Sequence, residues 1–171
     1  MNKISVLFVC LGYICRSPAA AAIFISLVEK KGLTAGFIVD SAGTGSWHIG
    51  KKADSRMRIA AERRDINILS RARQITSKDF DEFNYILAMD DSNFWNIQDL
   101  KNRTASTSFA SIKKIQDFRS VFNEHEVPDA YFGGDEGFYY VLDILEDSVN
   151  SLLESISWIY LISASLGILS L

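Results

Sequence analysis

The chain has 171 residues and a net charge of −3 at neutral pH, with 48% hydrophobic and 23% charged residues. These values are ordinary for one soluble globular domain, and the acidic balance argues against nucleic acid as a partner. The two prolines and the lack of low-complexity tracts leave no obvious linker. Two cysteines do not make a secreted disulfide framework, and no signal peptide precedes the first expected strand, so we expect a cytoplasmic protein.

The first informative stretch is the loop between an expected strand at residues 4–9 and an expected helix at residues 18–31. Ser17 and Pro18 are typical of a helix start, as the capping residue and the first helical residue. Free N–H groups at such a start, together with the helix dipole and the planar guanidinium of Arg16, suit a tetrahedral oxyanion. The same positive field favours a thiolate at Cys10, whereas an isolated cysteine is more often a packing residue. The loop is therefore expected to place a nucleophile at the base of a phosphate site.

The rest of the chain alternates between expected strands and helices. The strands are expected at residues 37–39, at 85–89 and within 112–118, and the helices at 54–64, from 76, from 90 to about 100 and from 135 to 155. This alternation is typical of a parallel sheet covered on both faces, in which ligands bind at the carboxyl ends of the strands. Cys10 directly follows the first strand and so lies at that edge. Asp90 and Asp91 also follow a strand, where helix capping is a better interpretation than a metal site.

Five separated motifs carry a family resemblance. The string VLFVCLGYICRSP at residues 6–18 resembles the active-site loop of the low-molecular-weight protein tyrosine phosphatases. The likeness continues, in the same order, in DSAGTGSWHIG (40–50), ARQIT (72–76), YILAMDDSN (85–93) and PDAYFGG (128–134), and it covers about residues 3–155. The resemblance implies a three-layer α/β fold with a four-stranded parallel sheet in flavodoxin-like order and helices on both faces. It also implies a phosphatase domain at residues 1–155. The resemblance fades after this point, and the apolar residues 156–171 are expected to form a C-terminal extension.

The resemblance implies a role for each residue that matches a family motif. Cys10 would be the nucleophile, Arg16 would bind the phosphate, Ser17 would hydrogen-bond the sulfur, and Asp129 would be the general acid. The other expected substrate-binding residues are Leu11, Gly12, Tyr13, Ile14, Cys15, Trp47, Tyr131 and Phe132. This chemistry needs no cofactor and no metal ion. We assign no catalytic role to His48, which stands alone in its loop.

The chain departs from the family pattern at four positions. Tyr13 stands where the family has an asparagine in a left-handed conformation, and Ser70 stands where it has a histidine of the same hydrogen-bond network. Ala130 replaces the proline that stiffens the acid loop, and Ala21 replaces an acidic residue of the first helix. Because tyrosine adopts positive φ less readily than asparagine, we expect reduced rather than absent activity.

The expected function is hydrolysis of phosphotyrosine in a protein, or of a small aryl phosphate, through a phosphocysteine, with inorganic phosphate as the product. An alternative is a catalytically impaired module that only binds phosphate or phosphotyrosine. Arsenate reduction, performed by relatives of the same fold, is less favoured because it needs further cysteines after Cys15. Residues 155–171 carry no charge, and we expect a helix that packs on the domain or on another copy, with membrane association the less favoured alternative.

Overall fold

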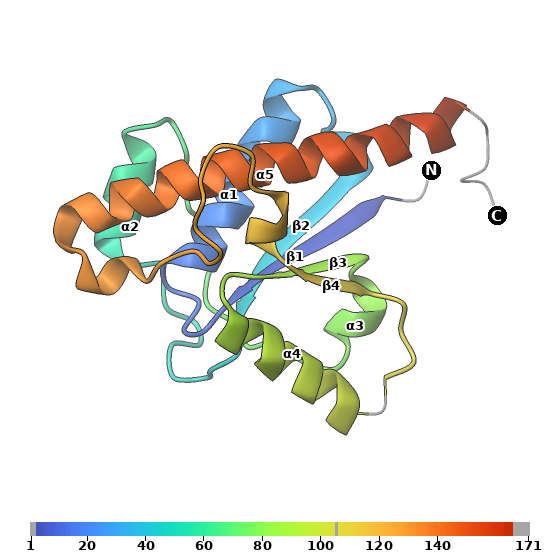
Figure 1. Ribbon diagram of the computed structural model, residues 1–171, viewed down its shortest axis with the longest axis horizontal. Coiled ribbons are helices and arrows are strands. Elements are labelled where there is room, and N and C mark those ends of the chain that lie inside the picture. Colours follow the sequence, from blue (N-terminus) through green and yellow to red (C-terminus); the bar gives the residue numbers. More distant parts are fainter. Residues whose placement is uncertain (1–2, 105, 166–171) are drawn as a thin grey trace.

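A four-stranded parallel sheet forms the centre of the protein. The computed structural model describes residues 3–104 and 106–165. The strands are β1 (Ile4–Cys10), β2 (Phe37–Gly43), β3 (Tyr85–Ala88) and β4 (Ser111–Lys114). Their order is β2-β1-β3-β4, and every pairing is parallel (Figure 1). The α/β fold and the flavodoxin-like order expected from the sequence are confirmed.

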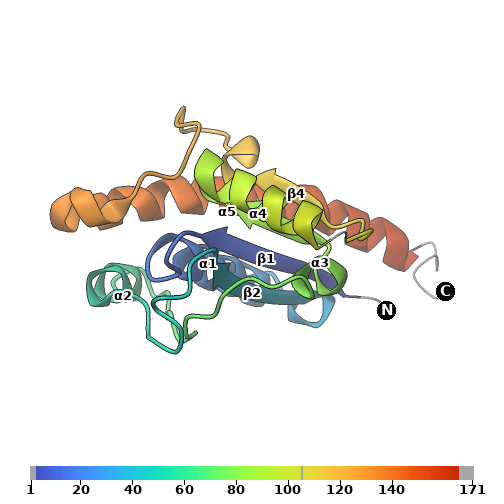
Figure 2. The ribbon, with the colours of Figure 1, turned by 90° about the horizontal axis from the view of Figure 1, so that it is seen from below.

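Helices cover both faces of this sheet. Strand β1 is apolar on both sides, because Val6 and Phe8 face one core while Leu7 and Val9 face the other. The first core is closed by α1 (Arg16–Lys30), α2 (Ser55–Glu62) and α5 (Gly134–Ser165), and the second by α3 (Asp79–Glu82) and α4 (Asp91–Arg103). Figures 1 and 2 show α5 running along α1, with α4 across the sheet from α1. The turn-length 3₁₀ segments are η1 (Thr34–Gly36), η2 (Ile115–Phe118) and η3 (Ala130–Phe132).

Several boundaries differ from the sequence prediction. Helix α1 begins at Arg16, so Ser17 lies inside its first turn and is not the capping residue. Cys15 occupies the cap position without a side-chain cap bond, and Pro18 is tolerated because N–H groups in a first turn have no helical acceptor. The fourth strand ends at Lys114, and residues 115–118 form η2 instead of continuing it.

Helix α5 runs without a break through the expected boundary at residue 155. It extends to Ser165, and Ile156 is buried in the main core. Further along, the ring of Tyr160 packs on Phe37 with 5.9 Å between ring centroids, where Gly36 leaves room because a Cβ there would lie 2.7 Å from the Tyr160 ring. Within the described residues, no helix is both long and apolar enough to cross a membrane. Residues 166–171 of the expected extension lie outside the described part.

Candidate active site

The loop between β1 and α1 turns its N–H groups inward and its carbonyls outward. Three loop carbonyls accept hydrogen bonds from outside the loop: Thr44 N–H donates to Cys10 O and Gly45 N–H to Leu11 O, each at 2.9 Å, and Asp54 N–H donates to Ile14 O at 2.7 Å. In the described part of the chain, the N–H groups of residues 11–15 donate to no protein oxygen. Buried N–H groups need acceptors, so the loop is a ready site for an oxyanion.

The Cys10 sulfur lies at the base of this loop and is nearly buried, since the residue is 3% exposed. Its Sγ is 3.1 Å from the Oγ of Ser17, which also lies 3.1 Å from the carbonyl oxygen of Ala42. A hydroxyl carries one proton, so Ser17 can donate either to Ala42 or to a Cys10 thiolate. Ser17 is therefore placed behind the sulfur, where it can stabilise negative charge on it.

Arg16 is buried at the opposite side of the loop and is held by two partners. Its Nη1 donates to Asp90 Oδ2 at 2.6 Å and to the carbonyl of Val127 at 3.0 Å. Burial disfavours its charge, but Cys10, Asp90 and Asp129 outweigh that effect and raise the pKa of Arg16, so it stays cationic. The Asp90 Oδ1 also accepts the Asn93 N–H at 2.7 Å, as the predicted cap of α4. Sequence reasoning found this cap but missed the role of Asp90 in orienting Arg16.

A hollow of about 290 Å³ opens over the loop. It is lined by Cys10, Leu11, Gly12, Ile14, Cys15, Arg16, Trp47, His48, Asp129 and Tyr131. Nine of these ten residues are expected site residues, and His48 is the addition. Ser17 lies behind the sulfur, and the side chain of Phe132 lies outside the described part. Among the described residues, no three His, Cys, Asp or Glu side chains are grouped as a metal site.

Two glycines let the Trp47–His48 loop fold over the phosphate loop. A Cβ on Gly45 would lie 2.3 Å from the Trp47 ring, and one on Gly12 would lie 3.2 Å from the His48 ring. His48 is half-buried, and within the described residues its Nδ1 has no hydrogen-bond partner. The indole and the imidazole thus form one wall of the hollow. The sequence signal that could have found His48 is its position next to Trp47.

Asp129 and Tyr131 also line the hollow. The exposed Asp129 is the capping residue of η3, and its Oδ1 accepts the Tyr131 N–H at 3.1 Å. Ala130 is 2% exposed and packs on α5, where a Cβ on Gly137 would lie 3.2 Å from the Ala130 carbonyl oxygen. The structure thus brings Asp129 to the same hollow as Cys10 and Arg16, although these residues are far apart in sequence.

The family model described as low molecular weight phosphotyrosine protein phosphatase matches residues 5–158. The chain belongs to this family. A curated member from Schizosaccharomyces pombe is 41% identical over 157 residues, which cover 91% of this chain and 99% of the relative. The structure of a product-state mimic of the Entamoeba histolytica protein tyrosine phosphatase matches with a TM-score of 0.84 and 42% identity, covering 91% of this chain and 96% of that one. YfkJ from Bacillus subtilis matches with a TM-score of 0.82 and 38% identity, covering 92% and 96%. The protein is therefore a hydrolase of phosphoric monoesters.

Tyr13 of this phosphatase points its side chain away from the hollow. Its backbone φ is +70°, and the residue is 1% exposed. Burial raises the pKa of the phenol, and the nearby Ser41 and Ser70 hydroxyls only partly offset this. Within the described residues the Tyr13 hydroxyl forms no hydrogen bond. The ring is buried and does not line the hollow, so only the Tyr13 backbone N–H can serve the expected binding role. The phenol lies on the side of Ser70, where the resemblance implies a histidine. We interpret Tyr13 and Ser70 as one coupled replacement: Tyr13 is larger than the asparagine that the family pattern has at this position, and Ser70 is smaller than the histidine.

This coupling predicts the effect of Tyr13→Asn in the phosphatase. Asparagine relieves backbone strain at positive φ, but it removes a buried ring, which should lower the free energy of unfolding by about 3 kcal/mol. We therefore expect no gain in kcat/KM from Tyr13→Asn alone and a partial recovery of stability in Tyr13→Asn/Ser70→His. Urea unfolding and steady-state kinetics of the two single variants and the double variant give the coupling free energy. A single variant that is as stable as the wild type and more active would contradict this interpretation.

Cys15 of the phosphatase shares the hollow with Cys10 and is a thiol at neutral pH. Burial, followed by the negative groups Asp54, Cys10 and Asp129, raises the pKa of Cys15 to about 12. Both cysteines are free in the structure. Peroxide can oxidise Cys10 to a sulfenic acid. The Cys15 thiolate can then attack the Cys10 sulfur, so that an S–S bond forms, the S–O bond breaks and hydroxide leaves.

We expect mild peroxide to inactivate the phosphatase and added thiol to restore it. Because the Cys15 thiolate fraction grows about tenfold per pH unit well below its pKa, disulfide closure should speed up about tenfold per unit between pH 7 and 9. Mass spectrometry of quenched samples measures the disulfide, and Cys15→Ala should recover less fully than the wild type. Equal recovery of the two proteins would show that Cys15 is only a packing residue.

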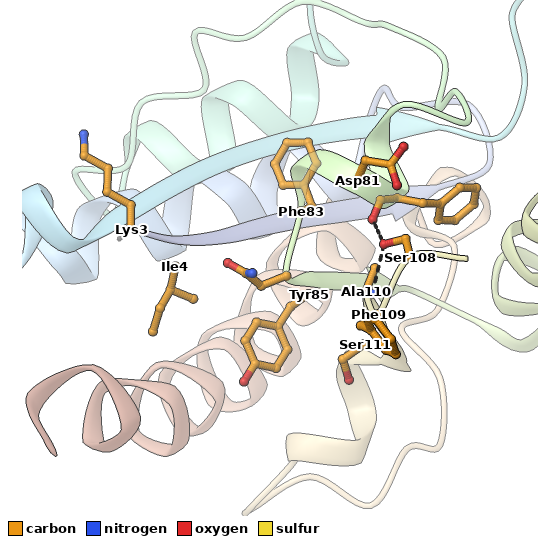
Figure 3. Close-up of a pocket in the computed structure, with 11 residues that line it drawn as sticks. Lys3, Ile4, Asp81, Phe83, Tyr85, Ser108, Phe109, Ala110 and Ser111 are labelled. Atoms are coloured by element: carbon orange, nitrogen blue, oxygen red, sulfur yellow. Dashed lines mark hydrogen bonds between the residues drawn. The ribbon is translucent and has the colours of Figure 1, made fainter. Parts of the chain in front are cut away.

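A larger hollow of the phosphatase, about 670 Å³, lies elsewhere. Figure 3 shows Lys3, Tyr85 and Ser111 around it, at the amino ends of β1, β3 and β4. In this view Ser108 donates to the carbonyl of Phe80, and the other labelled side chains are a mixture of polar and apolar groups. Ligands of parallel sheets bind at the carboxyl ends of the strands, and Cys10 lies at that opposite edge. The smaller hollow over the phosphate loop is therefore the candidate active site.

Proposed function

We propose that the protein hydrolyses phosphotyrosine in proteins, or small aryl phosphates, through a phosphocysteine intermediate and releases inorganic phosphate. The observation that carries this proposal is the phosphate loop, in which free N–H groups and a buried Arg16 surround the Cys10 sulfur. Asp129 lines the same hollow. Nucleophile, phosphate site and general acid are thus available around one phosphorus position.

In the first step, the Cys10 thiolate attacks phosphorus, and the bond from phosphorus to the phenolic oxygen breaks. The loop N–H groups and Arg16 bind the three equatorial oxygens, where charge is spread in the transition state. Asp129 donates its proton to the departing phenolic oxygen. In the second step, Asp129 accepts a proton from water as the water attacks phosphorus, the sulfur–phosphorus bond breaks, and Ser17 donates to the departing sulfur.

The walls of the hollow favour an aryl ester. Cys10 is only 3% exposed, whereas Leu11, Trp47 and Tyr131 at the mouth are 43%, 58% and 57% exposed. A substrate must therefore reach past an apolar rim before its phosphate meets the sulfur. A rigid phenyl ring spans such a depth and stacks on aromatic walls, which the short side chain of phosphoserine cannot do.

Steady-state hydrolysis of p-nitrophenyl phosphate, phosphotyrosine peptide and phosphoserine peptide tests the proposal. We expect turnover of both aryl esters and at least a hundredfold lower kcat/KM for phosphoserine. The second candidate, a module that only binds, is favoured by the strained Tyr13 backbone and by Ala130 in the acid loop. Phosphate binding without turnover of any of the three esters would establish the second candidate.

A further inference from the structure

Arg56 takes no part in the proposed chemistry, yet it links the phosphate loop to the acid segment, residues 128–132. On the first side it pairs with Asp54, through Nε to Oδ1 at 3.1 Å and Nη2 to Oδ2 at 2.9 Å. The backbone N–H of the same Asp54 donates to the loop carbonyl of Ile14 at 2.7 Å. The guanidinium of Arg56 is thus tied, through one residue, to the backbone of the phosphate loop.

On the second side, the Arg56 guanidinium lies against two aromatic rings. Its Cζ is 5.2 Å from the centroid of the Tyr131 ring and 4.7 Å from that of Phe138. Both distances are in the range of cation–π contacts. Phe138 is buried in α5, so it is a fixed platform, whereas Tyr131 is 57% exposed and belongs to the acid segment. Arg56 therefore connects the exposed ring of Tyr131 to the buried ring of Phe138.

The contact matters because no proline follows Asp129 in the acid segment. The Oδ1 of Asp129 accepts the Tyr131 N–H at 3.1 Å, so the carboxylate is tied to the backbone of the residue that carries the ring. Ala130 does not restrict the backbone as a proline would. Restraint must then come from contacts, and Arg56 supplies one that is tied to the phosphate loop.

We propose that Arg56 is a positioning residue, which holds Tyr131 and, through it, Asp129 at a set distance from Cys10. The proposal rests on the proposed function for its kinetic consequences. It also makes a prediction that is independent of activity: the acid segment is ordered by Arg56. Loss of Arg56 should impair proton delivery more than phosphate binding, because the N–H groups of the phosphate loop remain in place.

The test compares Arg56→Ala with Arg58→Ala, a matched control on the same helix whose guanidinium donates to the carbonyl of Ala53 at 3.1 Å and lies outside the hollow. We expect Arg56→Ala to lower kcat/KM about tenfold for phosphotyrosine but only about twofold for p-nitrophenyl phosphate, whose leaving group needs less protonation. Phosphate affinity should stay within twofold. Amide hydrogen exchange in residues 129–132 should be at least fivefold faster than in the wild type. Arg58→Ala should change neither kcat/KM for the two substrates nor amide exchange in the acid segment.

Arg56→Lys is the second variant, because it keeps the charge near the rings but cannot form the two-bond pair with Asp54. It should give intermediate values of both exchange and leaving-group dependence, and it serves as the main variant if Arg56→Ala does not fold. Exchange rates and substrate ratios equal to those of Arg58→Ala would overturn the proposal. If the wild type hydrolyses neither ester, the proposed function fails, and the exchange measurement alone decides whether Arg56 orders the acid segment.

Discussion

Cys10→Ser is expected to abolish turnover while the protein keeps its affinity for phosphate or vanadate. The serine hydroxyl is not ionised at neutral pH, so the covalent step is lost, but Arg16 and the N–H groups of residues 11–15 still bind the oxyanion. Loss of a nucleophile lowers kcat by roughly 10⁴-fold or more. Steady-state assays give the loss in kcat, and isothermal titration with phosphate gives the retained affinity.

Arg16→Ala provides the contrast for this prediction. It removes the buried guanidinium that lies between Asp90 and the hollow, so both turnover and phosphate affinity should fall. The two variants thus separate chemistry from binding. Turnover by Cys10→Ser within tenfold of the wild type would contradict the assignment of Cys10 as the nucleophile.

Asp129→Asn is expected to lower kcat far more for a poor leaving group than for a good one. A general acid contributes roughly 10²- to 10⁴-fold, and more as the leaving oxygen becomes more basic. The phenol of tyrosine has a pKa of about 10 and needs the proton, whereas p-nitrophenol leaves readily without it. A series of substituted phenyl phosphates should therefore give a shallow dependence on leaving-group pKa for the wild type and a steep one for the variant.

Asp135→Asn is a matched control, since Asp135 is an exposed carboxylate in the first turn of α5 and does not line the hollow over the phosphate loop. It should leave the series unchanged. An equal loss for all leaving groups in Asp129→Asn would mean that Asp129 shapes the hollow without delivering a proton. Asp90 and Asp91 are poor substitutes for this role, because Asp90 pairs with Arg16 and Asp91 with Lys114 at 2.7 Å.

The sequence by itself determined the strand, loop and helix around Cys10. These residues are contiguous, so an apolar β-branched run, a glycine and a helix start are sufficient to place a thiol and Arg16 at one phosphate site. The apolar spacing in residues 138–152 likewise predicts a helix, because a buried helical face needs contacts every three or four residues. Family resemblance was needed to choose Asp129 among 21 acidic residues.

Only the tertiary structure decided which distant groups meet. Asp90 orients Arg16, His48 lines the hollow, and Arg56 lies between Tyr131 and Phe138, all through contacts between separate elements. Local patterns report which face of an element is buried, but not which side chain of another element it meets. Ser17 shows the same limit: its sequence context indicates a helix cap, but the packing of α1 against β2 directs its hydroxyl to Cys10 and Ala42 instead. Ser17 contributes to the site because the parallel strands β1 and β2 end side by side, at Cys10 and Gly43. No local stretch of the chain encodes this pairing.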